Sequence, residues 1–277
     1  MISSNSNPAV KQIKLLRNRK DRQQSGLFYI EGIRIVAEAV KHIGLIEKLL
    51  FAPELLTSDF GYKLVEQVKQ KGIDTLELTK GVFNSLSLKE NPQGIAAVVH
   101  QRWNSLSNLR LEVTDLWVAL DSVADPGNLG TTLRTLDAVG GKGVILLDQS
   151  TDPFDPTSTR SSMGSIFTIE LIKTSFEDFS AWKKRYNYPV VGTSDKSVTD
   201  YHDCVYPQPL ILLMGSERQG LQENHIQLCD QMVSIPMVGQ NDSLNLAVAT
   251  AIVLYEVFNQ RRYSSEPKTL IESHGDF

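Results

Sequence analysis

The second half of the chain contains a series of short apolar runs, and their spacing limits the folds available to it. Each run is largely continuous rather than alternating, and helix-length segments separate most of the runs. Such runs are typical of parallel strands that helices cover on both faces. The runs lie at 116–120, 143–147, 189–193, 210–214 and 233–236. They predict an α/β domain over residues 114–263 built on a parallel sheet, with a final helix over about 244–262.

A smaller α/β unit is predicted over residues 25–101. Apolar segments of strand and helix character alternate there, at 28–30, 33–40, 46–51, 60–71 and 96–99. A length of 277 residues supports two such domains, each with its own core. The remaining segments are predicted to be a basic N-terminal helix within 1–24, a polar linker at 102–113 and a mobile polar tail at 264–277.

Charge is distributed unevenly along the chain. Residues 1–110 have 16 Lys and Arg against 10 Asp and Glu, a net charge of +6, whereas residues 111–277 have 12 against 22, a net charge of −10. Six basic side chains lie close together near the N-terminus: Lys11, Lys14, Arg17, Arg19, Lys20 and Arg22. They predict contact with the phosphates of a nucleic acid, and the alternative is a basic helix that faces only solvent.

Several classes of protein are excluded by what the sequence lacks. No apolar run approaches the roughly 18 residues that a membrane span needs, and the N-terminus has no apolar signal region, so we expect a cytoplasmic protein. Cys204 and Cys229 form no CxxC motif and have no nearby His at the spacing typical of metal ligands. We therefore expect free thiols and no metal site. There is no GxGxxG or GxxxxGK[ST] motif for a nucleotide, and no G-x-S-x-G elbow that would make Ser243 a hydrolytic nucleophile.

Three polar loops follow predicted strands. In an open parallel sheet, ligands bind beyond the carboxyl ends of the strands, so these loops, at 121–134, 214–221 and 235–251, are the candidate site. Taken singly, each loop has a purely structural interpretation. Asn128 and Ser243 are good caps for the helices that follow them, and Gly215 permits a tight turn.

Taken together, the three loops resemble the three motifs of the SpoU/TrmH family of RNA ribose 2′-O-methyltransferases, in the SPOUT superfamily. The matching stretches are DPGNLGTTLRTLDAVG at 125–140, LLMGSERQGL at 212–221 and IPMVGQNDSLNLAVATAIVLYE at 235–256. Residues 7–40 and 91–99 resemble the family's substrate-binding domain, which is similar to ribosomal protein L30e. The resemblance implies a C-terminal SPOUT domain with a deep trefoil knot beside a small L30e-like α/β domain. It also implies methyl transfer from S-adenosylmethionine to a ribose 2′-hydroxyl.

The resemblance further implies a set of site residues. The catalytic positions are Asn128, Arg134, Glu217, Ser243 and Asn245, and the cofactor pocket is formed around Thr193, Gly215, Ile235 and Leu244. Arg160 matches an arginine implicated in RNA contact, and a homodimer through the C-terminal domain is expected. An arginine guanidinium stays protonated in proteins, so we expect Arg134 to stabilise the developing alkoxide rather than to accept its proton.

Two alternatives concern the substrate and the activity. The basic N-terminal segment and the L30e-like domain suit a structured RNA, with ribosomal RNA favoured over transfer RNA. A non-catalytic RNA-binding paralogue would be expected to lose Arg134, Glu217 or Asn245, and all three are present. Many family members have Asn where this chain has Ser216, but the adjacent Glu217 is retained. A nucleotide-dependent dehydrogenase is disfavoured because its fingerprint is absent.

Overall fold

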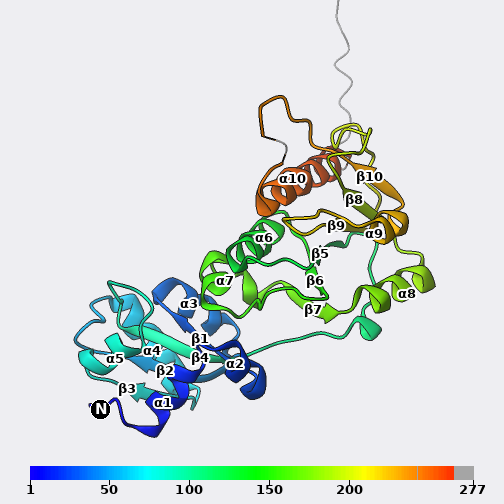
Figure 1. The fold of residues 1–277 in the computed structure, drawn as a ribbon. Helices are drawn as coiled ribbons and strands as arrows, with labels where there is room; N and C mark the ends of the chain where they lie inside the picture. The colour runs from blue at the N-terminus through cyan, green and yellow to red at the C-terminus, as the bar shows by residue number, and fades with distance from the viewer. Residues whose placement is uncertain (242, 265–277) are drawn as a thin grey trace, which may run out of the picture.

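The computed structural model describes residues 1–241 and 243–264, which form two α/β domains (Figure 1). The polar tail predicted at 264–277 lies outside the described residues, apart from Ser264 at the end of the last helix. Within the described ranges, no helix is both long enough and apolar enough to cross a membrane.

The N-terminal domain is built on a mixed sheet of four strands. Its elements are α1 (Pro8–Leu15), α2 (Arg19–Ser25), β1 (Leu27–Glu31), α3 (Ile33–Lys41), β2 (Ile46–Phe51), α4 (Asp59–Gln70), β3 (Asp74–Glu77), α5 (Lys80–Leu86) and β4 (Ile95–His100). The strand order is β1-β4-β2-β3, in which β4 is antiparallel to both of its neighbours and β2 is parallel to β3. Helices α3 and α4 pack on one face, and α1 and α5 pack on the other.

The single basic helix predicted near the N-terminus is wrong, because the segment forms two helices. The chain leaves helical geometry between α1 and α2, where Asn18 adopts an extended conformation, and α2 ends at Gly26 with a left-handed φ of 67°. The break allows both halves to pack. Val10, Ile13 and Leu16 are buried against the sheet, so this segment is part of the domain core rather than a solvated arm.

The C-terminal domain confirms the predicted parallel sheet. Its elements are β5 (Leu116–Asp121), α6 (Pro126–Ala138), β6 (Gly143–Leu147), α7 (Pro156–Ser161), β7 (Glu170–Thr174), α8 (Phe176–Tyr186), β8 (Val190–Thr193), β9 (Leu210–Met214), α9 (Glu223–Leu228), β10 (Gln231–Val233) and α10 (Leu246–Ser264). All six strands run parallel in the order β10-β8-β9-β5-β6-β7. The trefoil knot implied by the resemblance stays a prediction.

Two strands differ from the sequence prediction. Strand β7 was not expected, because Glu170 and Lys173 interrupt its apolar residues. It lies at the edge of the sheet, where one side is unpaired and charged side chains are tolerated. Strand β10 ends at Val233, so the predicted strand at 233–236 lies too far along the chain.

Helices cover both faces of the parallel sheet, as the continuous apolar runs require. Along β5, Trp117 and Ala119 face α8 and α9, whereas Val118 and Leu120 face α6 and α10. Every residue of β5, β6 and β9 is therefore buried. The three motif loops emerge at the carboxyl ends of β5, β9 and β10.

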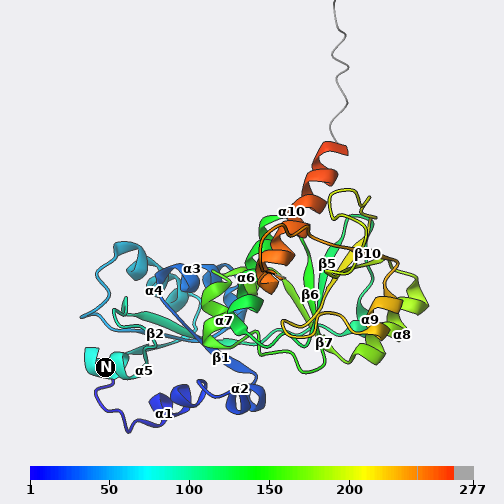
Figure 2. The same cartoon turned by 45° about the horizontal axis from the view of Figure 1, so that its top comes forward.

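The two domains share a packed junction. Helices α6 and α7 lie between their sheets (Figure 2), and the Phe28 ring of β1 lies 4.8 Å from that of Phe154, which Trp103 contacts edge-on at 5.3 Å. The predicted linker at 102–113 is not extended freely in solvent, because Leu106 and Leu109 are buried against the C-terminal sheet. The junction therefore holds the domains in a defined relation.

Candidate active site

The first motif loop enters α6 through a cap that differs from the predicted one. Asp125, rather than Asn128, is the N-cap, and its carboxylate accepts a hydrogen bond from the backbone N–H of Asn128 at 2.7 Å. Pro126 occupies the first turn, where its missing N–H costs nothing. Because Asp125 satisfies the helix end, the side chain of Asn128 is available for contacts outside the helix.

Glu217, in the loop after β9, connects the second motif to the first. Its carboxylate accepts hydrogen bonds from the backbone N–H groups of Ala124 and Asp125, at 3.2 and 3.4 Å, and from the Asn128 side-chain amide at 3.2 Å. Partial burial tends to raise the pKa of Glu217, but these hydrogen bonds and one from its own backbone outweigh that effect and lower the pKa. The carboxylate is therefore ionised at neutral pH and holds the first loop in place.

Asn245 adds the third motif to the same chain of hydrogen bonds. Its side-chain carbonyl accepts from the backbone N–H groups of Ala247 and Val248, at 2.9 and 3.3 Å, so Asn245 caps α10 and the predicted cap at Ser243 is wrong. This arrangement directs the Asn245 amide toward Asn128, whose side-chain oxygen accepts a hydrogen bond at 2.9 Å. The chain Glu217–Asn128–Asn245 thus joins all three motif loops.

A cavity of about 420 Å³ lies beside this chain, at the carboxyl ends of β8 and β9. Its lining includes the four residues predicted to hold a cofactor, together with two of the predicted catalytic residues: Thr193, Gly215, Ile235, Leu244, Glu217 and Ser243. Met214 and Leu246 contribute apolar surface to the wall of the cavity, and the loop after β9 contributes backbone polar groups. Such a mixture is typical of sites for small molecules and cofactors.

Gly215 forms part of this wall and has no room for a side chain. A Cβ atom at this position would overlap the backbone of Gly220 and Leu221, because the loop folds back on itself through a bridge between Ser216 and Gly220. The resulting tight loop exposes backbone groups to the cavity. A bulkier residue at position 215 would displace these backbone groups.

Arg134 lies on the exposed side of α6, about one and a half turns beyond Asn128. It forms no hydrogen bond or ion pair with the part of the chain that the structure describes. Its guanidinium therefore keeps its charge and its donors available for a ligand that approaches this face of the helix.

The six basic residues near the N-terminus have different surroundings. Lys11 and Lys20 are exposed, and Lys14 is half-buried with a long contact of 3.5 Å to the Asn5 side chain. Arg17 and Arg19 are exposed but donate to backbone carbonyls, Arg17 to those of Ser85 and Leu86 and Arg19 to that of Ser150. The phosphate contacts of these five residues stay a prediction.

Arg22 is a correction to the prediction, because it is 1% exposed and has no surface for a phosphate. Its guanidinium pairs with Asp152 at 2.8 Å and with Asp155 at 3.4 Å, and it also donates to the carbonyl oxygens of Leu16 and Arg17. Arg22 instead connects the N-terminal segment to the C-terminal domain.

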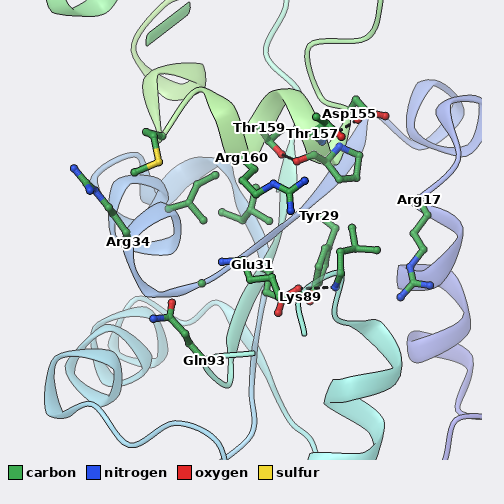
Figure 3. Close-up of a pocket in the computed structure, with 16 residues that line it drawn as sticks. Arg17, Tyr29, Glu31, Arg34, Lys89, Gln93, Asp155, Thr157, Thr159 and Arg160 are labelled. Carbon is green, nitrogen blue, oxygen red and sulfur yellow. Dashed lines mark hydrogen bonds between the residues drawn. The ribbon is translucent and has the colours of Figure 1, made fainter. Parts of the chain in front are cut away.

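A second cavity of about 450 Å³ lies between the two domains (Figure 3). Arg160 of α7 points into it, and Arg34 of α3 and Lys89 line its other side. Arg34 and Arg160 are exposed. Nothing in the sequence singles out Arg34 or Lys89, since only the packing of the two domains brings them near Arg160.

Comparison with known proteins agrees with this geometry. The profile of the SpoU rRNA Methylase family matches residues 115–255. The chain belongs to this family. The profile of the MRM3-like substrate binding domain matches residues 7–97, which run from α1 into the start of β4. The SpoU match contains β5 to β10 and all three motif loops, so the family assignment rests on the elements that form the candidate site.

Two curated relatives match this chain over most of its length. The 23S rRNA (guanosine(2553)-2′-O)-methyltransferase RlmP of Bacillus subtilis is 32% identical, over 92% of this chain and 98% of its own. The 23S rRNA (uridine(2479)-2′-O)-methyltransferase of Streptomyces viridochromogenes is 33% identical, over 89% and 88%. Among solved structures, an AdoMet-bound rRNA methyltransferase from Sinorhizobium meliloti is 35% identical with a TM-score of 0.85, over 95% of this chain and 97% of that one.

Proposed function

We propose that this SpoU-family chain transfers a methyl group from S-adenosylmethionine to a ribose 2′-hydroxyl of ribosomal RNA, in the cytoplasm. The observation that carries the proposal is the series of hydrogen bonds that connects Glu217, Asn128 and Asn245. This series holds the three motif loops around one cavity. The names of the two curated relatives support ribosomal RNA, because both are 23S rRNA 2′-O-methyltransferases that match over nearly the whole chain.

The cavity beside the motif loops fits S-adenosylmethionine. Backbone groups around Gly215, Ile235 and Leu244 would bind its polar parts, and Met214 and Leu246 would pack on its apolar surface. When bound, the cofactor supplies a methyl group on a sulfonium. Thr193 lies beside Met214 in the cavity lining, where its hydroxyl contacts the Met214 sulfur at 3.5 Å.

Arg134 would act on the nucleophile. A ribose hydroxyl is a weak nucleophile near neutral pH, so the site must stabilise the negative charge that develops on its oxygen. The guanidinium of Arg134 makes no hydrogen bond or ion pair with the described residues and is available for this role and for a neighbouring phosphate. Because an arginine stays protonated, the proton of the hydroxyl passes to water or to another group rather than to Arg134.

The RNA would lie across both domains. Arg160 and Arg34 present cations to the cavity between the domains, and Lys11, Lys14 and Lys20 add positive charge on α1 and α2. Phosphate contacts of this kind position an RNA without reading its sequence. The specificity for one nucleotide would then come from the shape of the RNA held between the domains.

A homodimer through the C-terminal domain is part of the proposal. Val248 and Tyr255 of α10 are each 48% exposed and lie seven residues apart, so they share one face of the helix. Val238 and Leu244, in the loop before α10, add exposed apolar surface. A second copy of the chain would bury this surface by a two-fold contact.

The deciding experiment is methyl transfer from labelled S-adenosylmethionine to total RNA, followed by mapping of the 2′-O-methyl position. We expect label in large ribosomal RNA and none in transfer RNA, and the Arg134→Ala variant serves as the catalytic control. Label confined to transfer RNA would change the substrate. Binding of RNA and of S-adenosylhomocysteine without any transfer would favour the non-catalytic paralogue.

A further inference from the structure

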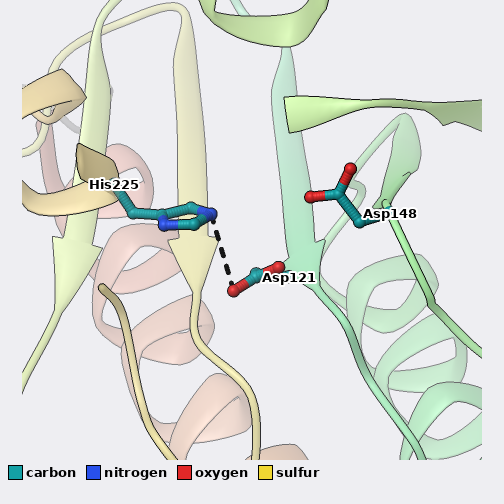
Figure 4. A group of neighbouring side chains, drawn as sticks. All are labelled: Asp121, Asp148 and His225. Carbon is teal, nitrogen blue, oxygen red and sulfur yellow. Dashed lines mark ion pairs between the residues drawn. The ribbon is translucent and has the colours of Figure 1, made fainter. Parts of the chain in front are cut away.

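Three side chains outside the candidate active site meet at the carboxyl ends of β5 and β6. Asp121 is the last residue of β5, Asp148 follows β6, and His225 belongs to α9 (Figure 4). One ligand atom from each lies within 4.8 Å of the others. Asp121 and His225 are 5% and 4% exposed, whereas Asp148 is exposed and opens the cluster to solvent.

The tautomer of His225 follows from its contacts. The Asn224 side-chain oxygen accepts a hydrogen bond from the backbone N–H of His225 at 3.0 Å, which identifies that atom as an acceptor. The same oxygen lies 2.9 Å from Nδ1 of His225, so Nδ1 must carry a proton. In the neutral ring, Nε2 is then an unprotonated nitrogen with a free lone pair. A histidine that donates its other N–H to an oxygen acceptor is the usual arrangement of a metal ligand.

The buried Nε2 atom has no hydrogen-bond partner and points toward carboxylates. The nearest oxygen, Oδ2 of Asp121, lies 3.5 Å away, beyond normal hydrogen-bond length. A lone pair facing a carboxylate in a buried site is unfavourable unless a cation lies between them. No Lys or Arg pairs with Asp121 or Asp148 in residues 1–241 and 243–264, so the only cationic side chain beside these carboxylates would be a protonated His225 ring, and with a neutral ring the cation must come from outside the described chain.

Each carboxylate keeps one oxygen for a ligand. Asp121 uses Oδ1 to accept from the Ser122 hydroxyl at 2.9 Å, and Asp148 uses Oδ1 to accept from the backbone N–H of Phe176 at 3.1 Å. The Phe176 ring also packs on the His225 imidazole, with centroids 3.9 Å apart, and holds it in place. The three ligands are thus oriented by their neighbours before any ion binds.

We propose that Asp121, Asp148 and His225 form a binding site for a divalent transition-metal ion of the Zn²⁺ class. Imidazole nitrogen and carboxylate oxygen are ordinary Zn²⁺ ligands, and at bond lengths of about 2.0–2.2 Å tetrahedral ligand atoms are about 3.4 Å apart. The separation of 3.5 Å between His225 and Asp121 already matches this value. The exposed Asp148 side chain closes the remaining gap, and water completes the coordination.

The ion would serve as a structural connection. It would tie α9, which follows the second motif loop, to the end of β5, from which the first motif loop emerges. The expectation from the sequence was no metal site, because the three ligands come from separate segments that only the fold brings together. Metal binding is independent of the proposed methyl transfer, and it can be measured without RNA or S-adenosylmethionine.

The test is titration of the chelator-treated protein with Zn²⁺ by competition with a chromophoric chelator, together with thermal unfolding. We expect one Zn²⁺ per chain and a higher unfolding temperature when it is bound. Asp148→Asn keeps the oxygen that accepts from Phe176 but removes the charged ligand, and His225→Gln removes the nitrogen. Both should weaken Zn²⁺ binding by at least about 100-fold, since loss of a ligand exceeds the 10–100-fold effect of its supporting residues.

His202→Gln is the matched control. His202 is also near a carboxylate, Glu256 at 3.3 Å, but its side chain is 73% exposed and, among the described residues, belongs to no group of three ligand side chains. This variant should bind Zn²⁺ as the unmodified protein does. The proposal is overturned if the unmodified protein shows no saturable binding, or if Asp148→Asn, which is exposed and should fold normally, retains full affinity. Should His225→Gln fail to fold, Asp148→Asn alone decides the outcome.

Discussion

Replacing Arg22 tests whether a basic residue in a basic segment contacts RNA or the protein itself. Arg22→Ala leaves Asp152, whose side chain is 7% exposed, without its cation, and it removes the donor from two backbone carbonyls. Loss of one partner of a buried ion pair costs about 3–5 kcal/mol. At about 2–4 °C per kcal/mol for a chain of this size, the unfolding temperature should fall by roughly 6–20 °C.

The assay is thermal unfolding followed by circular dichroism, with Lys20→Ala as the control on the same helix. Lys20 is exposed, so its loss should leave the unfolding temperature unchanged but reduce the salt dependence of RNA binding, by up to about 0.7–0.9 in the logarithmic slope if it contacts a phosphate. Asp152→Asn in an Arg22→Met background should recover part of the lost stability, because no unpaired charge remains. A stable Arg22→Ala protein with a reduced salt slope would refute the structural role.

Four further outcomes follow from the site and the surface of the C-terminal domain. Arg134→Ala should lower kcat by about 100-fold or more and leave S-adenosylhomocysteine affinity, measured by calorimetry, unchanged; a normal kcat would remove Arg134 from the mechanism. Gly215→Ala should abolish S-adenosylhomocysteine binding, because its Cβ overlaps Gly220 and Leu221, and retained affinity would contradict the placement of the cofactor. Glu217 has a lowered pKa in the folded protein, so its stabilising contribution is complete above its unfolded pKa and disappears as pH falls through the folded value; the difference in unfolding temperature between the unmodified protein and Glu217→Gln should therefore shrink as pH falls below the ordinary Glu pKa of about 4.3 and vanish only below the lowered folded value. Light scattering should give twice the mass of one chain, and Tyr255→Glu should shift it toward one.

The sequence predicted the parallel sheet because burial on both faces leaves a direct record in the apolar runs. It did not predict β7, since an edge strand tolerates Glu170 and Lys173. The cap of α6 could have been assigned correctly, because Pro126 favours the first helical position and so identifies Asp125 as the residue before it.

Contacts between distant segments were harder to predict from the sequence. The resemblance placed Asn128, Glu217 and Asn245 in one site, but no pattern in the sequence specifies which amide donates to which oxygen. Charge alone could not separate Arg22, which is buried, from Lys20, which is exposed. Removal of residues 1–24 would therefore be a poor test of RNA binding, because it also removes Val10 and Ile13 from the core.

The position of Asn245 has a consequence for synthesis of the protein. Asn245 begins the last helix, and it contributes the final hydrogen bond that connects the three motif loops. A nascent chain that has emerged only through β10 contains all six strands of the parallel sheet and the whole N-terminal domain, but it lacks this closing contact and part of the cavity wall. During synthesis, the N-terminal domain can therefore fold well before the C-terminal domain has its complete site.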